Sequence, residues 1–271
     1  MAGGKLETAL SYVILALFSL VVVLPVGWLL LAATSPKANA GVALNDIRWA
    51  NFVDAWVQAD FGQHLINSLV ICLGAVVLTS VLSILAGYGL TILAMPGRRF
   101  IFPLILAGIM IPLEGILVPL YYNFRSVGLT SSLTGLVIAH SGLGISFGVF
   151  WMRATLLAIP RELVESASLD GAGRLRTLVS IVVPVIRPAL MTMVLLMFMW
   201  TWNDYFLAFV LVNDETKMPV TLALGSFSSR YTQQLNLMSA AAVLVALPVL
   251  ILYMFFQRQF IQGVMSGALK A

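Results

Sequence analysis

Six stretches of this chain are apolar over the length that a helix needs to cross a lipid bilayer. A transmembrane helix takes about 20 mostly apolar residues, because the hydrocarbon core is roughly 30 Å thick. Only 10% of the residues are charged, against roughly 25% in ordinary soluble domains. The sequence therefore predicts an all-α, polytopic protein with six transmembrane helices embedded in membrane lipid. These helices are expected at residues 10–33, 66–94, 100–122, 133–155, 189–212 and 237–256.

The first apolar stretch differs from a secretory signal peptide. It is 24 residues long, whereas the apolar core of a signal peptide covers about 7–15 residues. We expect this stretch to remain in the membrane as an anchor. Residues 1–271 are accordingly interpreted as a single transmembrane domain.

The distribution of Lys and Arg predicts the orientation. With a cytoplasmic N-terminus, ten of the 15 basic residues fall in cytoplasmic segments and five fall outside. Basic residues concentrate in cytoplasmic loops of membrane proteins. We therefore expect both termini to face the cytoplasm. The net charge of +4 follows from this topology, so it predicts no nucleic-acid partner.

The cytoplasmic loop 156–188, between the fourth and fifth spans, is long enough to bind another protein. Pro160 suits the first position of a helix, and Glu162 suits the first turn, near the positive end of the helix dipole. Gly171 can adopt the left-handed conformation that ends a helix. These signals predict a short helix over residues 160–169.

A helix of roughly ten residues is not stable alone in water, so we expect it to dock on another surface. Leu163 and Ala167 supply a small apolar face, and Glu165 offers a carboxylate beside it. An alternative is a helix lying on the inner leaflet, held by Arg161, Arg174 and Arg176. A second amphipathic stretch, residues 174–183, is expected before Pro188 opens the fifth span.

The same loop carries a spaced motif. Residues 165–167 read Glu-Ser-Ala, Gly171 follows the glutamate by six residues, Ile181 comes ten later and Pro184 three further on. This pattern resembles the EAA loop of permease subunits of binding-protein-dependent ATP-binding-cassette importers: Glu-Ala-Ala, three residues, Gly, nine residues, Ile-x-Leu-Pro. Ser166 and Val183 are mild departures from that pattern.

Other segments are similar to the carbohydrate-uptake branch of these importers, in particular to the second permease of maltose-type systems. They are Pro112, residues 118–121, residues 202–204 and the tail 260–270. The resemblance implies a permease of the cytoplasmic (inner) membrane of a bacterium or archaeon. It implies as partners a second permease, two cytoplasmic ATPase subunits and an extracytoplasmic solute-binding protein that docks on the outer loops 34–61 and 213–236.

The resemblance also implies that the short helix is a coupling helix resting on a partner ATPase, which would bind the ATP and Mg²⁺. The C-terminal tail would add a further contact with the ATPase. No cofactor is expected in this chain itself. The residues assigned to coupling are Pro160, Leu163, Glu165, Ser166, Ala167, Asp170, Gly171, Ile181 and Pro184.

The sequence offers no support for an enzyme. No phosphate-binding loop of the Gly-x-x-x-x-Gly-Lys-Ser/Thr type occurs, so ATP hydrolysis must belong to a separate subunit. His64 and His140 lack metal-ligand spacing, and no nucleophile elbow is present. Cys72 is the sole cysteine, so the chain cannot form an internal disulfide.

Two carboxylates fall within predicted spans, Glu114 and Asp204. A charge at bilayer depth costs about 2.5–3.5 kcal/mol on insertion scales, so both should face the helix bundle or a wet cavity. Pro112 and Pro119 flank Glu114 and predict a kinked helix, which suits a gate. Aromatic and amide side chains nearby could bind sugar rings and hydroxyls: Tyr121, Tyr122, Asn123, Asn203 and Tyr205. The alternative for this second group is an interfacial aromatic belt with polar helix pairing.

The predicted function is translocation of a small-molecule substrate, a carbohydrate or related polyol compound, by alternating access driven by a partner ATPase. The alternative function is a proton-coupled secondary transporter that uses Glu114 and Asp204. Gly144 and Gly148 in the fourth span form a small-residue pair, and we expect them to pack against a helix of the same subunit.

Overall fold

The computed structural model describes residues 3–36, 46–93, 95–227 and 234–268, and within these ranges it does not describe the side chains of 3–6, 226 and 259–268. All regular secondary structure in these ranges is helical. Ala94, at the end of the predicted second span, lies outside the described residues, and so do the side chains of the tail motif 260–270. The chain divides into two compact units: unit 1 is Met1–Gly62 with Ala223–Pro248, and unit 2 is Gln63–Leu222 with Val249–Ala271.

Unit 1 is built around the end of the first long helix, α1 (Gly3–Ala33). A core of small side chains, with Ala33, Ala55 and Ala240 all 0% exposed, joins α1 to α2 (Ala50–Gln58) and α12 (Leu235–Ala268). Asn51 donates hydrogen bonds to the carbonyls of Ala33 (2.9 Å) and Ser35 (2.7 Å), which pairs the backbone that leaves α1. The most apolar window of α1 is exposed around its whole circumference, as expected of a lipid-facing helix.

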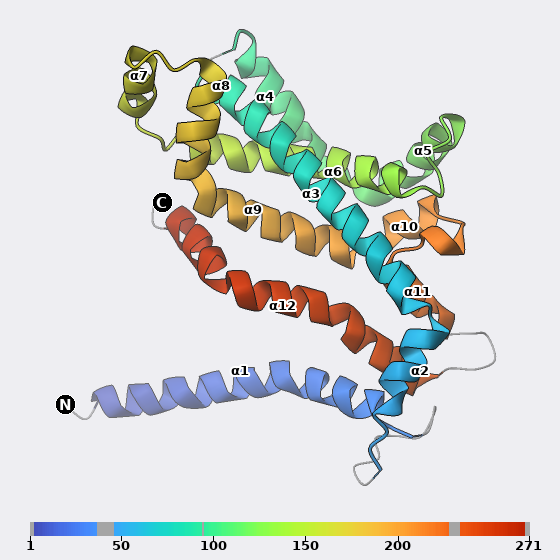
Figure 1. Cartoon of the computed structure of the whole chain (residues 1–271). Coiled ribbons are helices and arrows are strands. Elements are labelled where there is room, and N and C mark those ends of the chain that lie inside the picture. The colour runs from blue at the N-terminus through green and yellow to red at the C-terminus, as the bar shows by residue number, and fades with distance from the viewer. Residues whose placement is uncertain (1–2, 37–45, 94, 228–233, 269–271) are drawn as a thin grey trace. The chain divides into compact units, whose positions relative to one another are not determined.

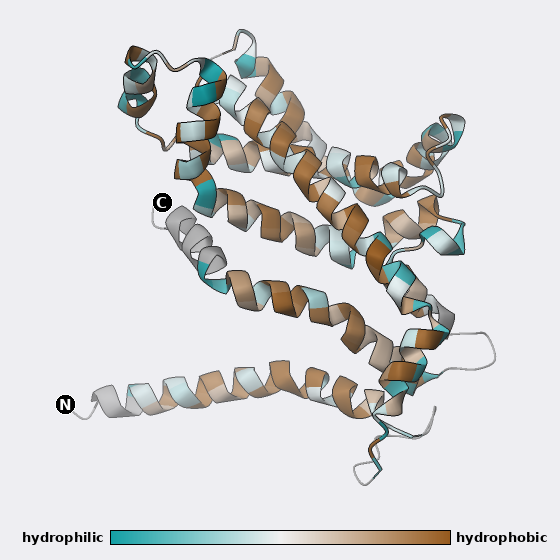
Figure 2. Cartoon of the chain, viewed as in Figure 1, coloured by the Kyte–Doolittle hydropathy of each residue, from teal (hydrophilic) through white to brown (hydrophobic). Residues whose placement is uncertain are grey.

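Unit 2 contains most of α3 (Phe61–Thr91), together with α6 (Leu133–Leu156) and α9 (Val183–Asn203). The α6 helix packs on α9 and on α4 (Arg98–Ala107). Apolar residues cover the lengths of α3 and α9, and hydrophilic residues gather at α7 and α8 (Figure 2). This distribution matches helices that bury their middles in a membrane.

Small residues allow α6 to approach its neighbours closely. A Cβ on Gly144 would lie 3.0 Å from Met197 Sδ of α9, and one on Gly148 would collide with the Ser83 hydroxyl of α3. The prediction that this pair packs within the subunit is confirmed.

Among the residues that the structure describes, five single helices are long and apolar enough to span a membrane, and a bent helix pair makes a sixth span if it is counted as one. The single helices are Glu7–Ala33, Phe61–Thr91, Leu133–Leu156, Arg174–Asn203 and Leu235–Arg258. The prediction of a polytopic helical membrane protein is confirmed for the described residues.

The third predicted span, 100–122, is wrong as a single helix. Arg98–Met110 and Leu113–Ser126 meet at 99°, a sharper break than the predicted kink. Ile111 is extended, with φ −79° and ψ 118°, because a proline at 112 disfavours the helical conformation in the residue before it. The break lies directly before α5 (Leu113–Ser126). Pro119 lies inside α5, and the helix runs on past it.

The fifth span also differs from its prediction of 189–212. The helix begins at Arg174, passes through the proposed start at Pro188, and ends at Asn203. Two carbonyls at this point of the helix accept side-chain bonds: Thr192 Oγ1 donates to Pro188 (3.1 Å), and Trp151 Nε1 of α6 donates to Ala189 (2.9 Å). The rest of the predicted span is a separate short helix, α10 (Phe206–Leu211).

Candidate coupling and translocation sites

The predicted helix in the fourth-to-fifth loop is present as α7 (Arg161–Leu169). It starts one residue later than predicted, because Pro160 has ψ 133° and stands as the residue before the helix. Gly171 has φ +77°, the left-handed conformation that was predicted to end the helix. The amide of Ala172 donates to the Ala167 carbonyl (2.9 Å), and the Gly171 amide donates to Ser168 (3.1 Å). These two bonds form a Schellman motif.

Burial within the chain limits which residues of α7 a partner could contact. Ala167 is only 4% exposed, and α7 packs against α8 (Arg174–Thr177) of the same chain. Of the predicted apolar docking face, Ala167 is therefore covered by this chain and Leu163 is half-buried. Glu165 and Asp170 are exposed, and Leu169, at the C-terminal end of α7, is 88% exposed.

The serine that replaces the motif alanine adds no free polar group to α7. Ser166 Oγ donates to the Glu162 carbonyl within the same helix (2.6 Å). Its hydroxyl is satisfied locally, as serines in helices commonly are. The departure from the motif therefore leaves the shape of α7 intact.

The second half of the motif lies where α8 continues into α9. Ile181 is half-buried in a π-helical turn, Leu178–Val182, and Pro184 is exposed at the start of α9. Pro184 has no N–H, so the carbonyl four residues earlier loses its ordinary helical partner at this point. Tyr88 Oη at the end of α3 donates to the Arg174 carbonyl (3.2 Å), which ties the start of this segment to the bundle.

Figure 1 places α7 and α8 at one end of unit 2, and α10 at the opposite end. The α7 helix thus joins the spans at one end of the bundle through α8 and α9. A displacement of α7 would reach α9 through its packing on α8, which continues as helix into α9.

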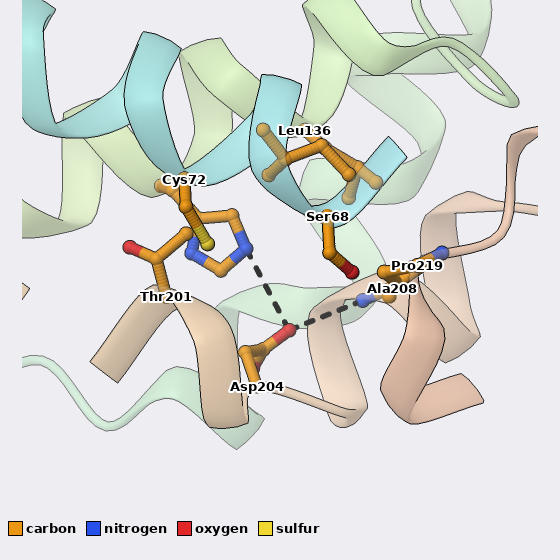
Figure 3. A pocket seen from close by; sticks show the side chains of 9 residues that line it. Ser68, Cys72, Leu136, Thr201, Asp204, Ala208 and Pro219 are labelled. Atoms are coloured by element: carbon orange, nitrogen blue, oxygen red, sulfur yellow. Dashed lines mark hydrogen bonds and ion pairs between the residues drawn. The ribbon is translucent and has the colours of Figure 1, made fainter. Parts of the chain in front are cut away.

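Asp204 stands at the break between α9 and α10. Its backbone is extended (φ −68°, ψ 136°), and its carboxylate accepts a hydrogen bond from the Ala208 amide (3.3 Å). His140 Nε2 of α6 lies 3.7 Å from the same carboxylate oxygen. Figure 3 shows Asp204 beside a small cavity lined by Ser68, Cys72 and Thr201, among others, and His140 also lines this cavity.

That cavity holds about 10 Å³, close to the roughly 10–15 Å³ that one water needs. A sugar ring cannot enter it. The side chain of Asp204, 14% exposed, therefore serves a polar contact inside the bundle in this conformation. His140 was not predicted as its partner, because 64 residues separate the two in the sequence.

The other predicted path residues do not line the Asp204 cavity, although Asn203 and Tyr205 flank Asp204 in the chain. Glu114 is exposed in the first turn of α5 and is absent from the lining of the Asp204 cavity. Tyr121 and Tyr122 make an edge-to-face contact (5.6 Å), and Asn123 is exposed beyond them. Asn203 is exposed and donates to the Met199 carbonyl (2.7 Å).

Tyr205 is 39% exposed and stacks on Phe209, with ring centroids 5.7 Å apart. The C-terminal half of α5 and the end of α9 thus carry exposed aromatic and amide groups. Contact of these groups with a substrate stays a prediction.

Comparison with known proteins places these features in a family. The family model described as "binding-protein-dependent transport system inner membrane component" matches residues 80–266, which include α7 and the motif loop. The diacetylchitobiose uptake system permease protein NgcG of Streptomyces coelicolor is 28% identical over 97% of this chain and 89% of its own length. The melibiose/raffinose/stachyose import permease protein MelC of Bacillus subtilis is 30% identical over 89% of this chain and 90% of its own.

The fold has a counterpart in a solved bacterial ABC transporter involved in the import of the acidic polysaccharide alginate. The superposition has a TM-score of 0.80 at 24% sequence identity, and it covers 94% of this chain and 97% of that one. These comparisons confirm the resemblance to ABC importer permeases that the loop motif predicted. The chain belongs to the family of inner-membrane components of binding-protein-dependent transport systems.

Proposed function

We propose that this chain is a permease subunit of an ATP-binding-cassette importer that carries a sugar, an oligosaccharide or a related polyol compound. The curated relatives are named as permeases for diacetylchitobiose and for melibiose, raffinose and stachyose, which supports a carbohydrate substrate. The proposed location is the cytoplasmic membrane of a bacterium or archaeon, with both termini in the cytoplasm. The whole chain serves as one permease domain.

The observation that carries the proposal is the form of α7. It is a short helix outside the spans, ended by Gly171, with Glu165 and Leu169 open to a partner. Such a helix gains little stability from its own length, so its definite position comes from packing on α8 and from its cap. A preformed, exposed helix of this kind suits a socket on a cytoplasmic ATPase subunit.

The proposed alternating access would use the connection of α7 to α9. Closure of two ATP-bound ATPase subunits would move α7, and α8 and the π-helical turn would pass that motion to the fifth span. The ATP and Mg²⁺ would reside on those subunits. A ligand shifts a conformational equilibrium only by its differential affinity for the two states, so ATP must favour the closed ATPase pair.

The remaining partners are a second permease and an extracytoplasmic solute-binding protein. The loops 34–61 and 213–236 are the proposed docking surface for the binding protein. Residues 37–45 and 228–233 of these loops lie outside the described residues. The separation of Glu114 from the Asp204 cavity and the family membership do not favour the proton-coupled alternative.

The test is transport by the purified, reconstituted complex. The chain is expressed with an affinity tag in its native host, and co-purifying ATPase and permease subunits are identified by mass spectrometry. We expect uptake in proteoliposomes to require ATP and binding protein, and to persist with a protonophore present. Uptake that continues with a hydrolysis-deficient ATPase and stops with the protonophore would refute the proposal. A thermal-shift screen of the binding protein against sugars and polyols would identify the substrate.

A further inference from the structure

The loop after α10 is exposed at its tip and organised throughout. It contains the single turn η3 (Glu215–Lys217) and leads to α11 (Val220–Ala223). Asp214 accepts hydrogen bonds from the Thr216 hydroxyl (2.8 Å) and the Thr216 amide (2.9 Å). These bonds hold the pKa of Asp214 below its usual range, so the tip keeps its negative charge.

The backbone of this loop is held by one polar turn at the start of α3. The side-chain nitrogen Nδ2 of Asn67 donates to the carbonyls of Thr216 and Met218, both at 2.9 Å. His64 Nδ1 lies 2.9 Å from the same Met218 carbonyl, and because a carbonyl only accepts, the ring nitrogen donates. Ser68 Oγ accepts from the Val220 amide (2.8 Å). We call His64, Asn67 and Ser68 the loop clamp.

The clamp is buried, so its bonds are shielded from water. Asn67 is 1% exposed, Ser68 2% and His64 9%. Gln63 Nε2 donates to Asn67 Oδ1 (3.1 Å), which turns both N–H groups of the Asn67 amide toward the loop. A buried backbone group left without a partner destabilises the structure, so the loop has a strong preference for this one conformation.

Two further bonds fix the ends of the loop. The Asn213 amide donates to Ser131 Oγ (3.0 Å), and Thr221 Oγ1 donates to the Asp204 carbonyl (2.7 Å). The segment between them is therefore tethered at its start, its middle and its end. Its tip, Asp214 to Lys217, stays exposed at the α10 end of unit 2 (Figure 1).

We propose that the loop clamp positions loop 213–220 for productive docking of the extracytoplasmic binding protein. This inference rests on the proposed function. The clamp residues are buried and contact the loop backbone, so they act through the loop and not by touching the binding protein. The partner meets the exposed tip, which is already in its docking conformation and loses little conformational entropy on binding.

The first measurement is proteolysis of the loop in the assembled complex. Trypsin cleaves after Lys217, and cleavage requires the loop to leave the clamp. Asn67→Asp replaces two donors by oxygens that repel the loop carbonyls, and we expect cleavage about tenfold faster or more, equivalent to about 1.4 kcal/mol or more. His64→Leu should also accelerate cleavage, whereas His64→Asn keeps a donor near Nδ1 and should restore resistance.

The second measurement is ATP hydrolysis stimulated by the substrate-loaded binding protein of the same system, in nanodiscs. With Asn67→Asp we expect the half-saturating binding-protein concentration to rise about tenfold, with the maximal rate retained. The control is Gln257→Glu, which makes the same amide-to-carboxylate change at an exposed site on α12, outside both proposed docking loops. The control should match the unmodified complex in both measurements.

The outcomes separate the two proposals. A lost maximal rate, or an unassembled complex with Asn67→Asp and His64→Asn alike, would mean that the clamp only stabilises the fold and would overturn the inference. Equal cleavage and equal half-saturation in Asn67→Asp and the unmodified complex would also overturn it. Absence of stimulation in the unmodified complex would instead contradict the proposed function.

Discussion

The left-handed residue that ends α7 provides the sharpest test of coupling. Gly171 has φ +77°, and a Cβ added there would meet no atom within 4 Å. A substitution therefore creates no clash, and its cost comes from the backbone alone. For a residue with a Cβ the left-handed conformation costs roughly 1–2 kcal/mol. A β-branched residue is disfavoured further, since φ > 0 makes it an outlier.

We expect Gly171→Val to release the Schellman bonds from Ala172 to Ala167 and from Gly171 to Ser168. A cost of about 1–2 kcal/mol lowers the population of the capped helix relative to uncapped forms by a factor of roughly 5–30. Membrane insertion and subunit assembly should persist, because Gly171 is exposed and lies outside the spans. The number of substrate molecules imported per ATP hydrolysed should fall.

The assay measures uptake and ATP hydrolysis on the same proteoliposomes, and it reports their ratio. Gly171→Asn is the matched control, because asparagine tolerates the left-handed region and should keep most of the coupling. If Gly171→Val transports with an unchanged ratio, the capped end of α7 has no part in transmitting motion. If both variants fail equally, side-chain bulk and not backbone conformation is responsible.

Three further predictions concern packing, the polar core of unit 1 and the broken third span. Gly148→Leu should push α6 away from α3 at the Ser83 contact, and we expect a lower yield of assembled complex in detergent. Gly142→Leu, at an open position, should leave that yield unchanged. Asn51→Leu removes both donors to the α1 end and should destabilise by about 1–3 kcal/mol, seen as a lower thermal midpoint of the purified protein. Glu114→Gln removes a negative charge from the first turn of α5, where the helix dipole stabilises such a charge by about 0.3–1 kcal/mol. Assembly should therefore persist. Uptake kinetics identical to those of the unmodified chain would exclude this side chain from the path.

Features that depend on neighbours in the sequence were predicted well. The helix after Pro160 and its stop at Gly171 follow from capping preferences that act over a few residues, and the structure confirms both within one residue. The spacing of Glu165, Gly171 and Pro184 was sufficient to identify the family. Local rules also indicated the break near Pro112, because the proline restricts the residue before it.

The sequence alone determined the membrane-spanning helical class, the short loop helix and the family, since hydropathy and capping act through local chemistry. Tertiary structure alone decided the 99° turn of the third span, the His140 partner of Asp204, and the burial of Ala167 against α8. It also decided the loop clamp, in which His64 meets a carbonyl 154 residues away. Hydrogen-bond partners at such separation are chosen by how helices pack, and no spacing rule along one chain encodes that choice.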